Sequence, residues 1–261
     1  MLLAIDCENS LITVGCINQD GAVEFVFRIP TDIGETEFGY AAKIKQILAL
    51  RQIDCSQFSG AILSCVVPPL NDTLIHAAKW MTGLEPLVVG AGIKTGLHLL
   101  INDPGTVAAD LVSSAVAAKE EYPLPAIIVD MGTATTVTVV DERARFIGGA
   151  ILPGVGIATE ALAQKTSLLP HIDLHPPKNA IAANTVDCMR SGVVYGSAGA
   201  VDGVIERLGE ELNNIPASVV ATGEFAKFIT PYCRHTMVLD ETLRLRGLKY
   251  IWDKNQSKKT V

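Results

Sequence analysis

AIIVDMGTATTVTVVDERARFIGG, residues 126–149, decides the fold of this 261-residue chain. An apolar strand ends in Asp130, and a small polar turn, a β-rich run, a charged turn and a third strand follow it. The chain opens in the same way, because LLAID ends in Asp6 and two further β-rich runs come next. The two aspartates stand almost half the chain apart, so the pattern predicts two similar lobes that each begin with a β-meander.

Between and after the two meanders, strand and helix signals alternate. Helical spacing is expected over residues 38–52 and 70–80, and short apolar strands over residues 60–66 and 85–89. This alternation is typical of an α/β protein whose sheet has a largely parallel core. A cleft between two such lobes is a natural place for a ligand.

The composition limits the class of protein. With 49% hydrophobic and 19% charged residues the chain can bury a sizeable core, and its net charge of −7 argues against nucleic acid or an anionic membrane as main partner. The longest apolar run is shorter than the ~18–20 residues that cross a bilayer, and MLLAIDCENS lacks the features of a signal peptide. The six cysteines form no CxxC pair, which favours reduced thiols in a cytoplasmic protein.

Each strand-end aspartate is followed by a turn that suits phosphate binding. Asp6 and Asp130 could hold a cation or its water shell, while backbone N–H groups and hydroxyls bind phosphate oxygens. In the second turn Gly132 allows a close approach and Thr133 offers a hydroxyl. An aspartate that caps a turn beside strand-forming threonines is the alternative. Because the arrangement occurs twice, nucleotide binding is favoured.

The first turn carries a charge that the second lacks. Glu8 occupies the position that corresponds to Gly132 in the second lobe. A glutamate within ~4–6 Å of a phosphate would repel it by roughly 1–4 kcal/mol at surface-like screening, whereas an intervening metal ion would reverse the sign.

The segment NDPGTVAADLVSSAVAAKEEY, residues 102–122, predicts a helix with Asp103 as its N-cap and Pro104 at its first position. Asp110 interrupts an otherwise small and apolar stretch about two turns into this helix. A carboxylate there would be costly if it were buried and unpaired, so it lies at a cleft or has a partner. A general base has this pattern, and so has a helix-surface aspartate; the residues alone leave both open.

Eight short motifs, taken in chain order, resemble those of the type III pantothenate kinases, a family of the acetate and sugar kinase, heat-shock chaperone and actin superfamily. They run collinearly from residue 4 to about residue 224, and the second-lobe pair DMGTATT and GGAILPG is the most specific. The resemblance implies two ribonuclease-H-like (actin-like ATPase) lobes, 1–120 and 121–261, with a nucleotide cleft between them. The motifs are DCENS (6–10), SCVVP (64–68), KTGL (94–97), NDPGTVAADL (102–111), DMGTATT (130–136), GGAILPG (148–154), NTVDCMRSG (184–192) and ATGE (221–224).

The resemblance also implies a reaction, the ATP-dependent phosphorylation of pantothenate that begins coenzyme A synthesis, in a homodimer whose site is completed across its interface. Asp6, Asn9 and Ser10 would face the ATP phosphates and Mg²⁺, and Thr133 would contact ATP. Asp130 would hold a monovalent cation, potassium or ammonium.

For the second substrate, the resemblance implies that Asp110 is the base that activates the pantothenate hydroxyl. The residues that would touch pantothenate are Ala108, Ala109, Asp110, Leu111 and Thr185. Carboxylates, hydroxyls and metal ions are chemically sufficient for phosphoryl transfer, which needs chiefly positioning and charge neutralisation.

Four positions depart from the family pattern. Glu8 replaces a glycine, Leu111 an arginine, Ile101 a frequent tyrosine, and Glu224 a glycine. Leucine cannot replace the bidentate donor that arginine offers to a substrate. Two alternatives to the pantothenate kinase therefore stay open from the sequence: a catalytically impaired or regulatory paralogue, and a kinase for another small hydroxy compound.

Overall fold

The computed structural model describes residues 1–212 and 216–256, and the chain forms two compact units. The first unit contains residues 1–97, residues 102–117 and the chain from Thr242 onward; the second contains residues 98–101 and 118–241. The C-terminal helix thus belongs to the first unit, whereas the division expected from the sequence, 1–120 and 121–261, assigned it to the second. No helix among the described residues has the length and apolarity needed to cross a membrane.

The first unit is built on a five-stranded sheet with the order β3-β2-β1-β4-β5. The first three strands form an antiparallel meander, and β4 and β5 run parallel to β1. The strands are β1 (Leu2–Cys7), β2 (Leu11–Ile17), β3 (Val23–Pro30), β4 (Gly60–Cys65) and β5 (Leu87–Val88).

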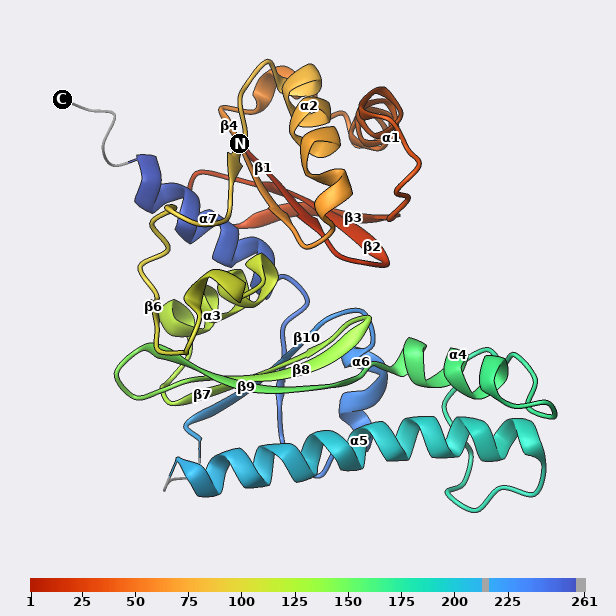
Figure 1. The fold of residues 1–261 in the computed structure, drawn as a ribbon. Coiled ribbons are helices and arrows are strands. Elements are labelled where there is room, and N and C mark those ends of the chain that lie inside the picture. Colours follow the sequence, from red (N-terminus) through yellow and green to blue (C-terminus); the bar gives the residue numbers. More distant parts are fainter. Residues whose placement is uncertain (213–215, 257–261) are drawn as a thin grey trace. The chain divides into compact units, whose positions relative to one another are not determined.

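Helices cover both faces of this sheet (Figure 1). On one face α1 (Glu37–Leu50) and α2 (Asn71–Thr82) pack against Leu3 and Ile5. The opposite face receives the C-terminal helix α7 (Leu243–Gln256), which contacts β1 and β4. Glycines on that face leave room for it: a Cβ at Gly15 would lie 2.8 Å from Leu245 Cδ1, and one at Gly60 would lie 2.1 Å from Trp252 Cζ2.

The second unit repeats this topology, which confirms the predicted repeat and fold class. Its six-stranded sheet has the order β11-β10-β7-β8-β9-β6, in which β9-β8-β7-β10-β11 correspond to β3-β2-β1-β4-β5. The strands are β6 (His98–Leu99), β7 (Ala126–Met131), β8 (Ala134–Val140), β9 (Arg145–Pro153), β10 (Ser218–Thr222) and β11 (Val238–Leu239). The helices are α4 (Val155–Lys165), α5 (Thr185–Glu211) and α6 (Ala226–Ile229), and α5 lies along the sheet in Figure 1 with Val194 and Ala198 in the common core.

The helix predicted to begin at Pro104 is divided in the structure. Asp103 caps only a short 3₁₀ turn, Pro104–Thr106, where its side chain accepts a hydrogen bond from the Gly105 N–H at 3.1 Å. Val107 is extended, and α3 begins afterwards at Ala109 and ends at Glu121. Asp110 consequently lies in the first turn of α3 and not two turns inside a longer helix. The other 3₁₀ turns are Cys55–Gln57, Pro68–Leu70 and Thr230–Tyr232.

Candidate active site

The first turn, Glu8 to Ser10, joins β1 to β2 and is closed by its own backbone. The Glu8 N–H donates to the Leu11 carbonyl oxygen at 2.9 Å, and the Thr31 hydroxyl donates to the Glu8 carbonyl oxygen at 2.7 Å. Asn9 and Ser10 are exposed at its tip. Two of the side chains predicted to face ATP phosphates, Asn9 and Ser10, are therefore accessible to a ligand.

Asp6 lies at the centre of a polar row across the first sheet. It pairs in register with Thr13 on β2 and with Ser64 on β4, so the three side chains share the face that α7 covers. All three are buried, and the Thr13 Oγ1 and Ser64 Oγ atoms have no hydrogen-bond partner among the residues that the structure describes. Buried hydroxyls beside a carboxylate suit a hydrated cation or a phosphate oxygen, which would satisfy them.

An arginine from the far end of the sequence completes this region. In the first turn of α7, Arg244 Nε lies 3.2 Å from Asp6 Oδ2, and Arg244 Nη2 donates to Glu8 Oε2 at 2.6 Å. Arg244 Nη1 contacts the other Glu8 oxygen, Oε1, so the guanidinium binds the carboxylate in a bidentate manner through both of its terminal nitrogens. The charge of Glu8 is thus matched by a buried guanidinium, which the sequence-based interpretation missed. A signal was present, since Arg244 stands between the buried Leu243 and Leu245.

Asp110 belongs to the same group of charges. Helix α7 packs closely on α3, because Gly247 has no side chain: a Cβ there would lie 1.8 Å from the Ser113 carbonyl oxygen. The pKa of Asp110 is raised to about 6: burial is the largest cause, the carboxylates of Asp6 and Glu8 also raise it, and Arg244 lowers it. The Leu111 N–H donates to Asp110 Oδ1 at 2.8 Å and also lowers this pKa. A carboxyl group with a pKa near 6 can accept and release a proton close to neutral pH.

The second turn, Gly132-Thr133, stands at the equivalent place in the second unit. Asp130 is buried and pairs in register with Thr136 on β8 and Thr222 on β10, which repeats the polar row of the first sheet. Behind it, Gly223 has a φ of +96°, and a Cβ at that position would lie 2.6 Å from Asp130 Oδ1. A glycine is therefore required where ATGE passes the aspartate.

The close succession of DMGTATT and GGAILPG has a physical reason. Gly154 follows β9 and is the N-cap of α4, and a Cβ there would lie 2.1 Å from the Thr133 carbonyl oxygen and 2.6 Å from that of Gly132. The backbone of one motif is thus in contact with the backbone of the other. The turn that would bind ATP is held from behind by a glycine 21 residues after Thr133.

The remaining predicted residues occupy several places. Ala108 precedes α3, Ala109 begins it, and Leu111 is half-buried in its first turn beside Asp110. In the second unit, Thr185 is exposed as the first residue of α5, which Asn184 caps by accepting from the Asp187 N–H. The structure therefore groups Asp6, Asp110 and the 108–111 segment in the first unit and places Asp130, Thr133 and Thr185 in the second. Of the other departures, Glu224 is exposed and Ile101 is half-buried.

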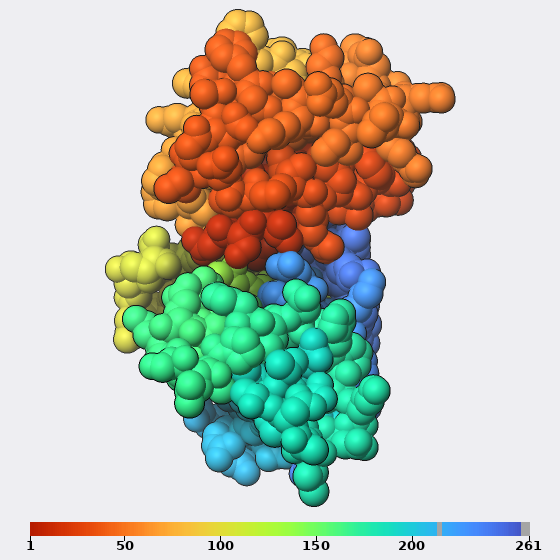
Figure 2. Space-filling view, turned by 90° about the vertical axis from the view of Figure 1, so that its right-hand side faces the viewer, coloured from red at the N-terminus to blue at the C-terminus, as the bar shows by residue number. Residues whose placement is uncertain are grey.

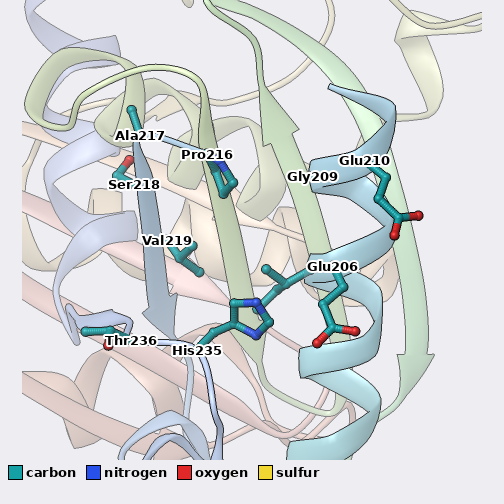
Figure 3. A pocket seen from close by; sticks show the side chains of 10 residues that line it. Glu206, Gly209, Glu210, Pro216, Ala217, Ser218, Val219, His235 and Thr236 are labelled. Carbon is teal, nitrogen blue, oxygen red and sulfur yellow. The ribbon is translucent and has the colours of Figure 1, made fainter. Parts of the chain in front are cut away.

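A pocket of about 650 Å³ lies elsewhere in the second unit, between the C-terminal part of α5 and the start of β10 (Figure 3). Glu206 and His235 point into it in the close view, and His235 Nδ1 also lies 3.0 Å from Asp202 Oδ1. None of the residues predicted to bind ligands lines this pocket.

Comparison with known proteins agrees with this architecture. Two solved structures share the fold over nearly the whole chain. The activator of the 2-hydroxyisocaproyl-CoA dehydratase from Clostridium difficile, with bound ADPNP, has a TM-score of 0.56 at 10% identity and covers 100% of this chain and 97% of its own. The ethanolamine utilization protein EutJ from Carboxydothermus hydrogenoformans has a TM-score of 0.55 at 13% identity, with 95% of this chain and 89% of its own covered. The two units, each with a strand-end aspartate, have the ribonuclease-H-like fold of the actin-like ATPases.

The family follows from sequence similarity. The family model described as type III pantothenate kinase matches residues 2–207. Curated proteins named type III pantothenate kinase are 40% identical over 257 residues in Brevibacillus brevis and 39% identical over 256 residues in Shouchella clausii, each covering 98% of this chain and 100% of the relative. The chain belongs to the type III pantothenate kinase family, which confirms the resemblance seen in its motifs.

Proposed function

We propose that this protein transfers the γ-phosphoryl group of ATP to the hydroxyl of pantothenate, the first step of coenzyme A synthesis. Membership of the family supports this activity. The main structural support for this activity is Asp110, which lies in the same unit as the buried Asp6 and has its pKa raised to about 6. A base for a hydroxyl group and a carboxylate for a phosphate-bound cation are the two groups that this reaction needs.

ATP is the first substrate in this proposal. In it, Asp6, Asn9 and Ser10 face the ATP phosphates and Mg²⁺, and the Thr133 hydroxyl contacts ATP. Among the described residues, no three His, Cys, Asp or Glu side chains are grouped so that they could hold a metal ion. A single carboxylate fits Mg²⁺ nonetheless, because that ion commonly keeps several waters and takes phosphate oxygens as ligands. When bound, it would neutralise phosphate charge, and the buried hydroxyls of Thr13 and Ser64 support a hydrated cation beside Asp6.

A monovalent cation, potassium or ammonium, is proposed at Asp130. The carboxylate is buried, and Thr136 lies opposite it in the β7–β8 ladder with a buried Oγ1 that has no hydrogen-bond partner in the described part of the chain. Oxygen ligands on one side of a strand end suit a hard cation. This role is distinct from that of Asp6, which would act through the nucleotide.

Pantothenate would meet the N-terminal turn of α3. Asp110 removes the hydroxyl proton as the oxygen attacks phosphorus, and the backbone of the preceding segment orients the substrate. The residues proposed to contact pantothenate are Ala108, Ala109, Asp110, Leu111 and Thr185. The first four adjoin one another at the start of α3, and Thr185 comes from the exposed start of α5.

The proposed assembly is a homodimer. The second unit exposes apolar side chains along β9, α4 and the loop before α5, a region drawn in green in Figure 2. Ile151 is 76% exposed, Leu168 90% and Ile181 91%, and exposed apolar side chains of this size are candidates for an interaction surface. A cytoplasmic location is proposed as well, since all six cysteines are free.

The test is an assay of the purified full-length chain for pantothenate phosphorylation with ATP and Mg²⁺, with and without potassium or ammonium. The Asp110→Asn variant is the control for the base, and light scattering gives the oligomeric state. Turnover that depends on Asp110 is expected, together with a rise in melting temperature on addition of ATP. An unchanged melting temperature combined with no turnover would contradict the proposed function.

A further inference from the structure

The pairing of Glu8 with Arg244 has a consequence for the proposed ATP site. The Arg244 side chain is 8% exposed and that of Glu8 16%, so the two charges meet largely away from water. Both terminal nitrogens of the guanidinium contact the Glu8 carboxylate, and Nε lies 3.2 Å from Asp6 Oδ2. A bidentate, charge-assisted pair is a strong interaction, so Glu8 is a strong partner of Arg244.

The position of the guanidinium is important because Asp6 has another proposed role. If Glu8 lost its charge, Arg244 would still contact the carboxylate of Asp6. A guanidinium drawn onto Asp6 would compete with the Mg²⁺ proposed to act there. Glu8 therefore limits how strongly Arg244 occupies Asp6.

The opposite change would be equally unfavourable. Without Arg244, Asp6 and Glu8 would keep their negative charges two residues apart in a region from which most water is excluded. The two carboxylates would repel each other and a nucleotide phosphate, and burying such charges without a partner is costly. Each residue is thus tolerable only in the presence of the other.

We infer that Glu8 and Arg244 form a compensated pair in which Arg244 is the positioning residue of the first turn. The pair neutralises the acidic turn and keeps Asp6 available to the cation that accompanies ATP. This inference deepens the proposed function and rests on it for the role of Asp6. The close contact of α7 with the sheet, which Gly15 and Gly60 permit, is what brings Arg244 to the turn.

The experiment is a double-mutant cycle on the full-length protein, with Glu8→Gln, Arg244→Gln and the double variant. The melting temperature without nucleotide is the first readout. The second, which a merely structural role would not change, is the Mg²⁺ dependence of the dissociation constant for ATP, measured by calorimetry. The exposed pair Lys79 and Glu85, 2.6 Å apart in the same unit, provides the matched cycle of Lys79→Gln and Glu85→Gln.

Each single variant of the buried pair is expected to lower the melting temperature by roughly 6 °C or more, and the double variant to recover at least half of the loss. Glu8→Gln should raise the Mg²⁺ concentration needed for ATP binding by about 10-fold, and the double variant should return to within about 3-fold of the wild type. The exposed control pair should change neither quantity appreciably. If a single variant does not fold, Arg244→Lys, which keeps the charge and loses the fork, replaces it.

The outcomes separate the inference from the proposed function. Additive effects in the cycle, in a wild-type protein that binds ATP, would overturn the pair and leave the kinase proposal intact. A wild-type protein that binds no ATP would contradict the proposed function, whereas coupled melting temperatures would still support the pair.

Discussion

The two turns that follow Asp6 and Asp130 occupy equivalent places in the two sheets and differ in length and charge. The first has three residues, Glu8 to Ser10, between β1 and β2; the second has two, Gly132 and Thr133, between β7 and β8. At the spacing of 124 residues that separates Asp6 from Asp130, Val14 would match Thr138, and the shorter second turn shifts this match by one residue. In the first sheet Val14 lies opposite Ile5, and in the second sheet Val137 lies opposite Val129. The structural counterpart of Val14 is therefore Val137, one residue before Thr138.

The two turns are also supported in different ways. The second is held by two glycines of its own unit, since Gly154 lies against the backbone of Thr133 and Gly223 lies against Asp130. The first contains an acid and needs Arg244, which lies 236 residues from Glu8 along the chain. A turn at this place in the sheet can therefore contain a glycine that adds no charge, or an acid whose charge an arginine matches. Four measurements can test whether the two turns differ in this way.

The largest effect is expected in the first unit, at Asp110. Asp110→Asn removes the proposed base and should lower kcat by about 10²–10⁴-fold, because an amide cannot accept the hydroxyl proton. ATP binding, measured by calorimetry, should change little. If Asp110→Asn kept most of its turnover, the chemistry would not depend on the first unit in this way.

Moving the acid of the first turn into the second is the next largest change. Gly132→Glu would place a carboxylate at a buried position near Asp130, and we expect a loss of roughly 3 kcal/mol in the free energy of unfolding, measured with urea. Gly192→Glu, at an exposed site on α5 with open space around it, is the control and should cost nothing. Equal stability of the two variants would show that the second turn tolerates an acid without an arginine.

Asp130→Asn should separate the two aspartates by their cations. Loss of the charge should weaken activation by potassium or ammonium by about 10-fold or more, while the Mg²⁺ dependence of turnover stays close to that of the wild type. The measurement is the turnover rate of the variant and the wild type as the concentration of each cation is varied separately. A change confined to Mg²⁺ would reverse the roles proposed for Asp6 and Asp130.

The smallest effect concerns pH. Asp110 must be ionised to act as base, so kcat/KM should fall below a pH of about 6. Glu8→Gln removes a carboxylate that raises this pKa, so the acid limb should move to lower pH; Arg244→Gln should move it higher. The pKa of Asp110 in the folded protein lies above its value in the unfolded chain, so the folded state gains stability from this group as the pH falls from about 6 toward 4. Asp110→Asn should abolish this pH-dependent gain in the free energy of unfolding. If neither substitution moved the acid limb, the pKa of Asp110 would not depend on the charges of Glu8 and Arg244.

The fold was largely predictable because its signals are local and occur twice. Alternating apolar strands that end in Asp6 and Asp130 specify both meanders, and the structure confirms them. The start of α3 was not predictable from the cap at Asp103, since a 3₁₀ turn uses the same capping pattern and Val107 then leaves the helical region. The residues proposed for catalysis follow from motifs, and their roles stay predictions.

The sequence by itself determined the repeated α/β units, the strand-end aspartates and the family. Only the tertiary structure decided the environment of Glu8. Residue spacing fixes which side chains share a strand or a helix face, whereas a contact between residues 8 and 244 depends on how α7 packs on the sheet. The physical reason is that side-chain charge acts over a few ångströms in space, and separation along the chain does not limit it.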